Sequence, residues 1–170
     1  MRKFKALMIA LMTLAFLAVI VFLLKFAGYG LTYQVSTSMP KGFYFIKPAP
    51  SELKQNMKVV FSPPTRVQRM LLKHHWVPQS GLLMKYVMAR PGDHVCYYSN
   101  SLWVNGRRLV PIYHFYAPGK PLPSYHFCGT LSADNYLLIS HQDDHSFDSR
   151  YFGPINRKAI IGEAIAVMDI

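Results

Sequence analysis

The stretch of sequence that decides the fold reads Leu82-Leu83-Met84-Lys85-Tyr86-Val87-Met88-Ala89-Arg90-Pro91-Gly92-Asp93. An apolar run that ends at a Pro-Gly-Asp turn is typical of a buried β-strand. Alternate residues of a strand share one face, so Lys85 is expected on the same face as Leu83 and Val87. The sequence therefore predicts a lysine enclosed in an apolar strand.

Segments of the same kind occur on both sides of this strand. They are short, rich in aromatic and β-branched residues, and separated by Pro, Gly or Asn. We expect strands over 42–46, 57–61, 82–89, 94–98, 102–104, 108–110, 136–140 and 159–168. Asn105-Gly106 predicts a tight hairpin, because a type I′ turn needs positive φ at both central residues. The Pro-rich stretch 111–123 predicts an irregular surface excursion.

One segment, residues 65–76, has the periodicity of a helix. One face would carry Val67, Met70, Leu71 and His74, while Arg66, Arg69 and Lys73 lie mostly off that face. This pattern favours a short surface helix. The fold class that follows is mainly β, an antiparallel β domain with a short helix.

The first residues predict a membrane anchor. Residues 1–5 are basic, and residues 6–24 carry no charge over a length close to the ~20 residues that span a bilayer. A cleaved signal peptide is the alternative, but its apolar core is shorter and residues 26–30 make a poor cleavage site. Basic residues remain on the cytoplasmic side. We expect a cytoplasmic tail (1–5), a single transmembrane helix (6–24) in the inner membrane, and a periplasmic domain (25–170).

Composition limits the class of protein and its partners. The chain has 170 residues, of which 51% are hydrophobic, and a formal net charge of +11. This length allows about one domain, and the apolar content excludes a disordered chain. The positive charge favours anionic partners, but no nucleic-acid-binding motif is present. We therefore expect inner-membrane lipids rather than nucleic acid as a partner, with Arg66, Arg69 and Lys73 as candidate contacts.

Three polar boxes follow the anchor in order. The first is Ser36-Thr37-Ser38-Met39-Pro40, the second places Lys85 before the Pro-Gly-Asp turn that ends at Asp93, and the third is Ser146-Phe147-Asp148-Ser149-Arg150. Together they resemble the type I signal peptidase family over nearly the whole chain. The resemblance implies a signal-peptidase-like β domain that acts as a serine endopeptidase.

Two departures from the usual family pattern are informative. Met39 is followed directly by Pro40, where the family has one more residue, and Ser140-His141-Gln142 replaces Gly-Asp-Asn. Both features, together with Cys128-Gly129 and the stretch 147–155, look like the conjugative plasmid-transfer branch, the TraF-like pilin-processing peptidases.

The resemblance implies a role for each box. Ser38 would be the nucleophile and Lys85 its general base, while the Ser36 hydroxyl would help to form the oxyanion hole. Ser36 as a plain strand-edge hydroxyl remains an alternative; if the segment is extended, its hydroxyl points to the same side as that of Ser38. Ser146 would hold the Lys85 amine. Asp148 and Arg150 would form an ion pair that positions the loop, and Ser149 has a less defined structural part.

The chemistry supports this assignment independently of the family. A serine hydroxyl is a poor nucleophile and needs a nearby base. A lysine acts as that base only when it is neutral, and burial lowers its pKa. The apolar setting of Lys85 meets this need. The structural alternatives are a lysine whose stem lies along the surface while its amine reaches water, and a lysine paired with another group.

No metal or other cofactor is expected. His141, Asp143, Asp144 and His145 are close in sequence, but their spacing fits no standard ligand pattern. A carboxylate-rich loop of this kind is ordinarily just solvated.

The function that follows is removal of a leader or tail from a secreted or pilin precursor, bound as an extended strand near 42–46 and the Lys85 strand. Water or a substrate amine would resolve the acyl-enzyme, and an amine would cyclise the pilin; the sequence leaves both open. One alternative is a housekeeping signal peptidase for secretory preproteins. Another is a non-catalytic assembly factor of the conjugative secretion apparatus, which is a candidate partner in either case.

Cys96 and Cys128 are the two cysteines of the chain. In an oxidising compartment such a pair is expected to form a disulfide. Two buried free thiols are the alternative.

Overall fold

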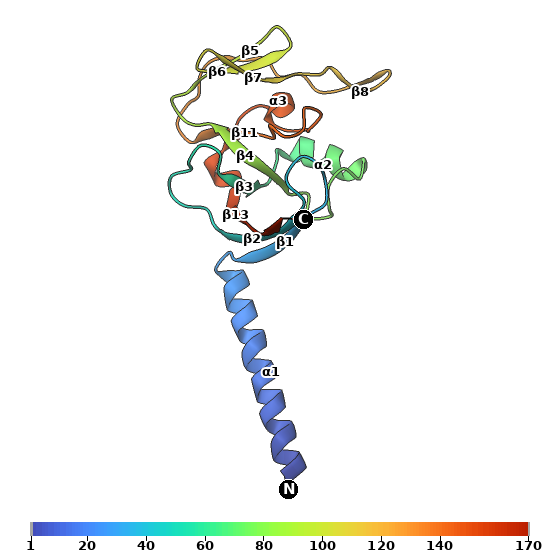
Figure 1. The fold of residues 1–170 in the computed structure, drawn as a ribbon, viewed down its shortest axis with the longest axis vertical. Coiled ribbons are helices and arrows are strands. Elements are labelled where there is room, and N and C mark those ends of the chain that lie inside the picture. The colour runs from blue at the N-terminus through green and yellow to red at the C-terminus, as the bar shows by residue number, and fades with distance from the viewer. Residues whose placement is uncertain (1, 170) are drawn as a thin grey trace.

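The strand that contains Lys85 lies inside the larger of two main sheets. The computed structural model describes residues 2–169, and Figure 1 shows a β body with one long helix extending from it. The larger sheet has seven strands in the order β1-β2-β13-β3-β4-β11-β12, all antiparallel. Its strands are β1 (Gly30–Gln34), β2 (Gly42–Pro48), β3 (Lys58–Phe61), β4 (Leu83–Ala89), β11 (Asn135–Ile139), β12 (Ile155–Asn156) and β13 (Ile160–Asp169).

A second sheet and a small hairpin cover the far end of the body. The four-stranded sheet has the order β10-β5-β6-β7, and β8 pairs with β9. These strands are β5 (His94–Tyr98), β6 (Ser101–Val104), β7 (Arg107–Pro111), β8 (Phe115–Ala117), β9 (Lys120–Pro121) and β10 (Cys128–Thr130). The hairpin at Asn105-Gly106 is confirmed, with φ of 50° and 75°. The prediction of an irregular 111–123 was wrong in part, because β8 and β9 form a hairpin there.

The two faces of β4 pack into separate clusters, as the alternation of its side chains predicted. Met84 belongs to the core shared with the second sheet, whereas Leu83 and Val87 pack in the cluster that contains Leu71 of α2 (Thr65–Lys73). The Lys85 side chain lies on the second of these faces and is only 3% exposed. The expectation of an enclosed lysine is confirmed.

Three α-helices complete the described chain together with one short 3-10 helix: α1 (Arg2–Phe26), α2 (Thr65–Lys73), α3 (Ser149–Phe152) and η1 (Arg157–Ala159). The surface helix α2 is confirmed, with Arg66, Arg69 and Lys73 exposed. It is shorter than expected, since it ends before His74, whose side chain is exposed and therefore does not belong to the buried face.

Helix α1 extends away from the β body (Figure 1). Lys3–Phe26 is long and apolar enough to cross a membrane, and none of its most apolar window is buried against the protein. The helix ends where Gly28 takes φ of 85° and Tyr29 N–H bonds back to the Leu24 carbonyl at 2.9 Å. Met1 and Ile170, the outer ends of the predicted tail and periplasmic domain, lie outside the described residues.

Candidate active site

Ser38 lies in a turn between β1 and β2. The segment is not extended here, because the chain must reverse direction within a few residues to pair the two strands. Met39 is almost fully buried in the core, and the Tyr44 hydroxyl donates a 2.8 Å hydrogen bond to the Pro40 carbonyl. These contacts anchor the turn and leave Ser38 half-buried at its surface.

The Ser36 hydroxyl still lies on the same side as that of Ser38. Their oxygen atoms are 3.0 Å apart, and the Gln34 side-chain amide donates to Ser36 Oγ at 2.7 Å. Gln34 was missed in the sequence analysis. The i, i+2, i+4 spacing of Gln34, Ser36 and Ser38 is the signal that could have found it. Here a turn, rather than an extended strand, brings the three side chains together.

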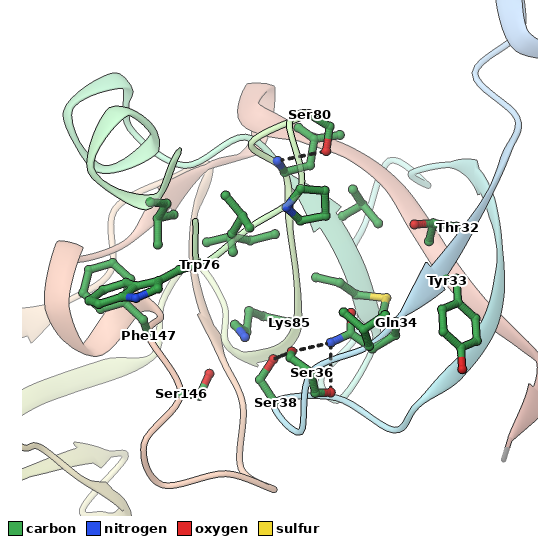
Figure 2. A pocket seen from close by; sticks show the side chains of 18 of the residues that line it. Thr32, Tyr33, Gln34, Ser36, Ser38, Trp76, Ser80, Lys85, Ser146 and Phe147 are labelled. Carbon is green, nitrogen blue, oxygen red and sulfur yellow. Dashed lines mark hydrogen bonds between the residues drawn. The ribbon is translucent and has the colours of Figure 1, made fainter. Parts of the chain in front are cut away.

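The Lys85 amine reaches the same site from β4. Figure 2 shows its amine end near the labelled Ser38 and Ser146. Burial lowers the pKa of Lys85 to about 8; the charge of Asp148 opposes this shift and that of Arg150 adds to it. The amine is thus far easier to deprotonate than that of an ordinary lysine. No hydrogen bond joins Lys85 to Ser38 within residues 2–169.

Ser146 is placed as predicted but does not make the predicted contact. Its side chain is buried, and its hydroxyl has no hydrogen-bond partner in the part of the chain that is described. The expectation that it bonds the Lys85 amine is therefore not met in this structure. A buried hydroxyl without a partner is rare. In Figure 2 the Ser146 hydroxyl lies near the Lys85 amine.

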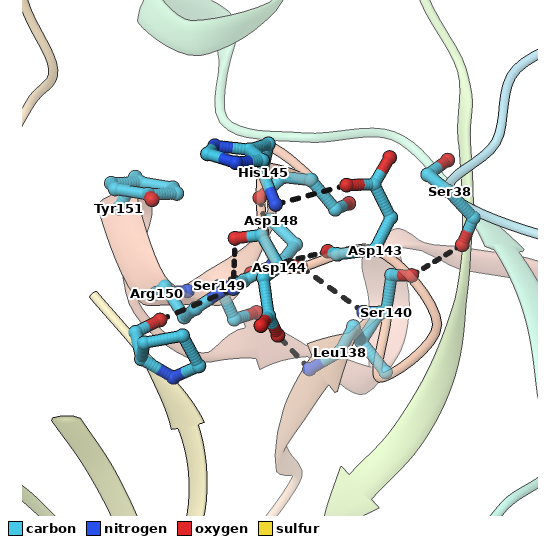
Figure 3. Close-up of polar contacts among 12 residues, drawn as sticks. Ser38, Leu138, Ser140, Asp143, Asp144, His145, Asp148, Ser149, Arg150 and Tyr151 are labelled. Atoms are coloured by element: carbon cyan, nitrogen blue, oxygen red, sulfur yellow. Dashed lines mark hydrogen bonds and ion pairs between the residues drawn. The ribbon is translucent and has the colours of Figure 1, made fainter. Parts of the chain in front are cut away.

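The Asp148–Arg150 ion pair is confirmed. Arg150 Nη2 lies 2.8 Å from Asp148 Oδ2, and both side chains are fully buried. Burial disfavours the charge of Arg150, but hydrogen bonds and the charge of Asp148 outweigh it and raise the pKa of the guanidinium. The remaining donors of Arg150 bind the carbonyls of Pro111, Asp143, Asp144 and Ser146. Figure 3 shows this pair at the centre of the loop.

Ser149, whose role was not defined by the sequence pattern, is structural. Its hydroxyl accepts a hydrogen bond from Leu138 N at 3.1 Å, and its carbonyl accepts one from the Tyr97 hydroxyl at 2.8 Å. Ser149 therefore ties the loop to β11 and to the second sheet.

A groove of about 880 Å³ contains both Ser38 and Lys85. One wall is the chain from Gly28 to Ser36, and the other includes residues 82–85. Both walls have open sheet edges. β1 is the last strand of its sheet, and β4 pairs with β11 only from Tyr86 onward, which leaves one side of Leu83–Lys85 without a neighbouring strand in the described chain. The expected edge at 42–46 was wrong, because β2 is paired on both sides, with β1 and β13.

The acidic loop does not form a metal site. Within the described residues no three His, Cys, Asp or Glu side chains are arranged to hold a metal ion. The side chains have other contacts: His141 packs on the Tyr86 ring, His145 stacks on Tyr113, and Asp143 accepts a hydrogen bond from Thr37.

A comparison with known protein families places this geometry in context. The family described as signal peptidase, peptidase S26, matches residues 3–168 of the chain. The chain belongs to this signal peptidase family. A family member of this kind is a peptidase, a hydrolase of peptide bonds.

Three relatives indicate which branch of the signal peptidase family this chain is similar to. Two plasmid transfer proteins TraF from Escherichia coli are 36% and 35% identical to it, the first over 78% of this chain and 79% of its own length, the second over 81% and 83%. Signal peptidase I V of Bacillus subtilis (strain 168) is 29% identical over 50% of this chain and 56% of its own length. The similarity to the TraF-like branch of the family is thereby confirmed.

Proposed function

We propose that the chain is a membrane-anchored serine endopeptidase in which Ser38 is the nucleophile and Lys85 the general base. The observation that carries this proposal is the buried amine of Lys85, whose pKa of about 8 makes it a base at the wall of a groove that also holds Ser38. The absence of a Ser38–Lys85 hydrogen bond is compatible with this role, since catalytic contacts often tighten only when substrate binds.

The reaction proceeds in two steps. The Ser38 oxygen attacks the carbonyl carbon before the scissile bond while neutral Lys85 takes its proton. The Ser36 hydroxyl and the Ser38 N–H stabilise the oxyanion. The resulting ammonium returns the proton to the leaving amine, and an acyl-enzyme remains on Ser38. Water or a substrate amine then releases the product by the same proton path in reverse.

The substrate lies as an extended strand in the groove. The free edge of β1 and the free side of Leu83–Lys85 offer backbone donors and acceptors on both walls. An inserted strand would pair with one or both of them and bring its carbonyl to Ser38. This placement replaces the edge at 42–46 expected from the sequence.

The enzyme is anchored in the inner membrane by α1, with its catalytic domain in the periplasm. The basic residues before the apolar helix favour a cytoplasmic N-terminus. Arg66, Arg69 and Lys73 are exposed and available to anionic lipid head groups. A periplasmic reporter fused after Ile170 should be active, and activity of a cytoplasmic reporter there would contradict the topology.

The relatives named plasmid transfer protein TraF support a role for this chain in conjugative transfer. We assign the chain to maturation of a pilin precursor in conjugative transfer, in association with the secretion apparatus. Mass spectrometry of the mature pilin would distinguish hydrolysis from cyclisation, because a cyclic product weighs one water less than the linear one. The likeness to signal peptidase I V of Bacillus subtilis supports a second candidate, cleavage of ordinary secretory preproteins.

The test is precursor processing by Ser38→Ala, Lys85→Ala and Lys85→Arg. All three should be inactive while still folded and anchored; the arginine variant fails because a guanidinium does not lose its proton. Lys54→Arg, in an exposed loop, is the matched control and should process normally. Processing by Ser38→Ala would instead support the non-catalytic assembly factor.

A further inference from the structure

Two hydrogen bonds fasten the turn that carries Ser38 to the segment 140–143. Thr37 Oγ1 donates to Asp143 Oδ2 at 2.6 Å, and the Ser140 hydroxyl donates to the Ser38 carbonyl. Figure 3 shows Ser140 beside Ser38, with Asp143 in the same loop. The two contacts hold the nucleophile from both sides of its peptide unit.

The Asp143 end of this clamp is itself fixed. Its second carboxylate oxygen accepts a hydrogen bond from His145 N at 2.9 Å. Its carbonyl accepts bonds from Ser146 N at 3.0 Å and from Arg150 Nη2 at 3.2 Å. The backbone and one carboxylate oxygen of Asp143 are thus held within the loop, and the other carboxylate oxygen accepts the hydrogen bond from Thr37.

We propose that Asp143 is a positioning residue, which holds the Ser38 turn through Thr37 and adds a negative charge to the groove wall that it shares with Lys85. This inference rests on the proposed function, since it concerns the same Ser38–Lys85 pair. It assigns two separable effects to one carboxylate: the geometry of the nucleophile and the charge near the base.

The charge effect has a definite sign. Burial is the main cause of the lowered pKa of Lys85; Asp148 and Asp143 favour the ammonium, and Arg150 disfavours it. The Thr37 hydrogen bond is the main cause of the lowered pKa of Asp143, so this carboxylate is charged wherever the enzyme works. Removing its charge makes Lys85 easier to deprotonate, and the pH at which activity rises should fall.

The experiment compares four variants of the full-length enzyme in detergent micelles: Asp143→Asn, Thr37→Val, Thr37→Ser and Asp144→Asn. The substrate is a peptide that wild type cleaves, and Ser38→Ala is assayed with the same peptide. kcat and KM are measured across pH. Asp144→Asn is the matched control, because it makes the same charge change on an exposed neighbouring side chain.

Thr37→Val and Asp143→Asn should lower kcat about 10- to 100-fold with little change in KM, as expected for a displaced nucleophile. Thr37→Ser keeps the hydroxyl and should restore kcat. A fifth variant combines Thr37→Val with Asp143→Asn. Its kcat should be no lower than that of the less active single variant, because both substitutions remove the same contact. Only Asp143→Asn should also move the midpoint of the pH profile to lower pH.

Two results would overturn the inference alone. In the first, Asp143→Asn has the kcat and the pH-profile midpoint of wild type. In the second, Asp143→Asn loses kcat with an unchanged midpoint, and Thr37→Ser does not recover kcat. The exposed Thr37 side chain keeps the test open if Asp143→Asn fails to fold, as judged by its melting temperature. Cleavage that survives Ser38→Ala would overturn the proposed function and this inference with it.

Discussion

The hydroxyl oxygens of Ser36 and Ser38 lie 3.0 Å apart, at the groove wall that faces the Lys85 strand. The Gln34 amide donates to Ser36 Oγ, so the Ser36 proton is free to point toward Ser38 or toward an oxyanion formed there. A plain strand-edge hydroxyl would not need the Gln34 amide as a partner. This contact therefore favours Ser36 as a donor to the oxyanion hole.

We predict that Ser36→Ala lowers kcat by about 100- to 1,000-fold, the usual effect of losing one oxyanion donor. Ser36→Thr retains the hydroxyl and should keep most of the activity. Gln34→Leu leaves the donor but not its orientation, so its loss should be smaller. Single-turnover kinetics with a cleavable peptide measure these effects, and a wild-type rate in Ser36→Ala would exclude Ser36 from the oxyanion hole.

The second prediction concerns the buried ion pair of the loop. Arg150→Met leaves the Asp148 carboxylate buried without its partner, and should lower the free energy of unfolding by about 3–5 kcal/mol. Arg150→Lys should also destabilise, since an ammonium does not reproduce the planar fork that binds the Asp144 and Ser146 carbonyls. Denaturant unfolding of the full-length protein measures both.

The double variant Asp148→Leu with Arg150→Met is the control for this pair. It removes both charges, so it should be more stable than Arg150→Met alone. If Arg150→Met is as stable as wild type, the ion pair does not hold the loop.

The third prediction concerns the disulfide between Cys96 and Cys128, which are directly opposite each other on β5 and β10. The bond closes a loop with a sequence separation of 32, for which the chain-entropy model gives roughly 3–4 kcal/mol. Cys128→Ser should therefore melt at a lower temperature while cleavage at low temperature survives. Alkylation of both thiols in the unreduced, denatured protein would contradict the bond.

Local patterns in the sequence predicted the strands that are long and apolar, such as β4 and β13. They missed β1, whose five residues begin with Gly30, and β12, which has two residues and exists only through its pairing with β11. Such strands are defined by tertiary partners rather than by their own side chains.

The same division applies to the site. Ser38, Lys85 and the Asp148–Arg150 pair stand in recognisable boxes, and the structure brings these boxes together. The contacts that set their geometry, Thr37 to Asp143 and Ser140 to Ser38, join residues 106 and 102 positions apart. No local periodicity encodes such a contact, so the sequence alone could not predict it.

The last prediction separates stability from activity at Lys85. Its pKa is about 8 in the folded protein and near the ordinary 10.5 when unfolded. Between these values the unfolded chain binds more protons, so the free energy of unfolding should rise with pH from about 8 to about 10.5. Below pH 8 the fold bears the full cost of a buried ammonium, on the order of 3 kcal/mol.

Lys85→Met removes this titration and fills the same apolar site. We expect the variant to be inactive but more stable than wild type at pH 7, with the difference shrinking as pH rises from 8 toward 10.5. Lys54→Met, at an exposed position, should change neither stability nor its pH dependence. Denaturant unfolding at a series of pH values measures the effect. Two results would contradict this prediction: a Lys85→Met variant that is less stable than wild type at pH 7, or a gain in stability that does not depend on pH. Either result would show that the buried amine is paired well enough to bear its charge. The case for a neutral lysine base would then fail.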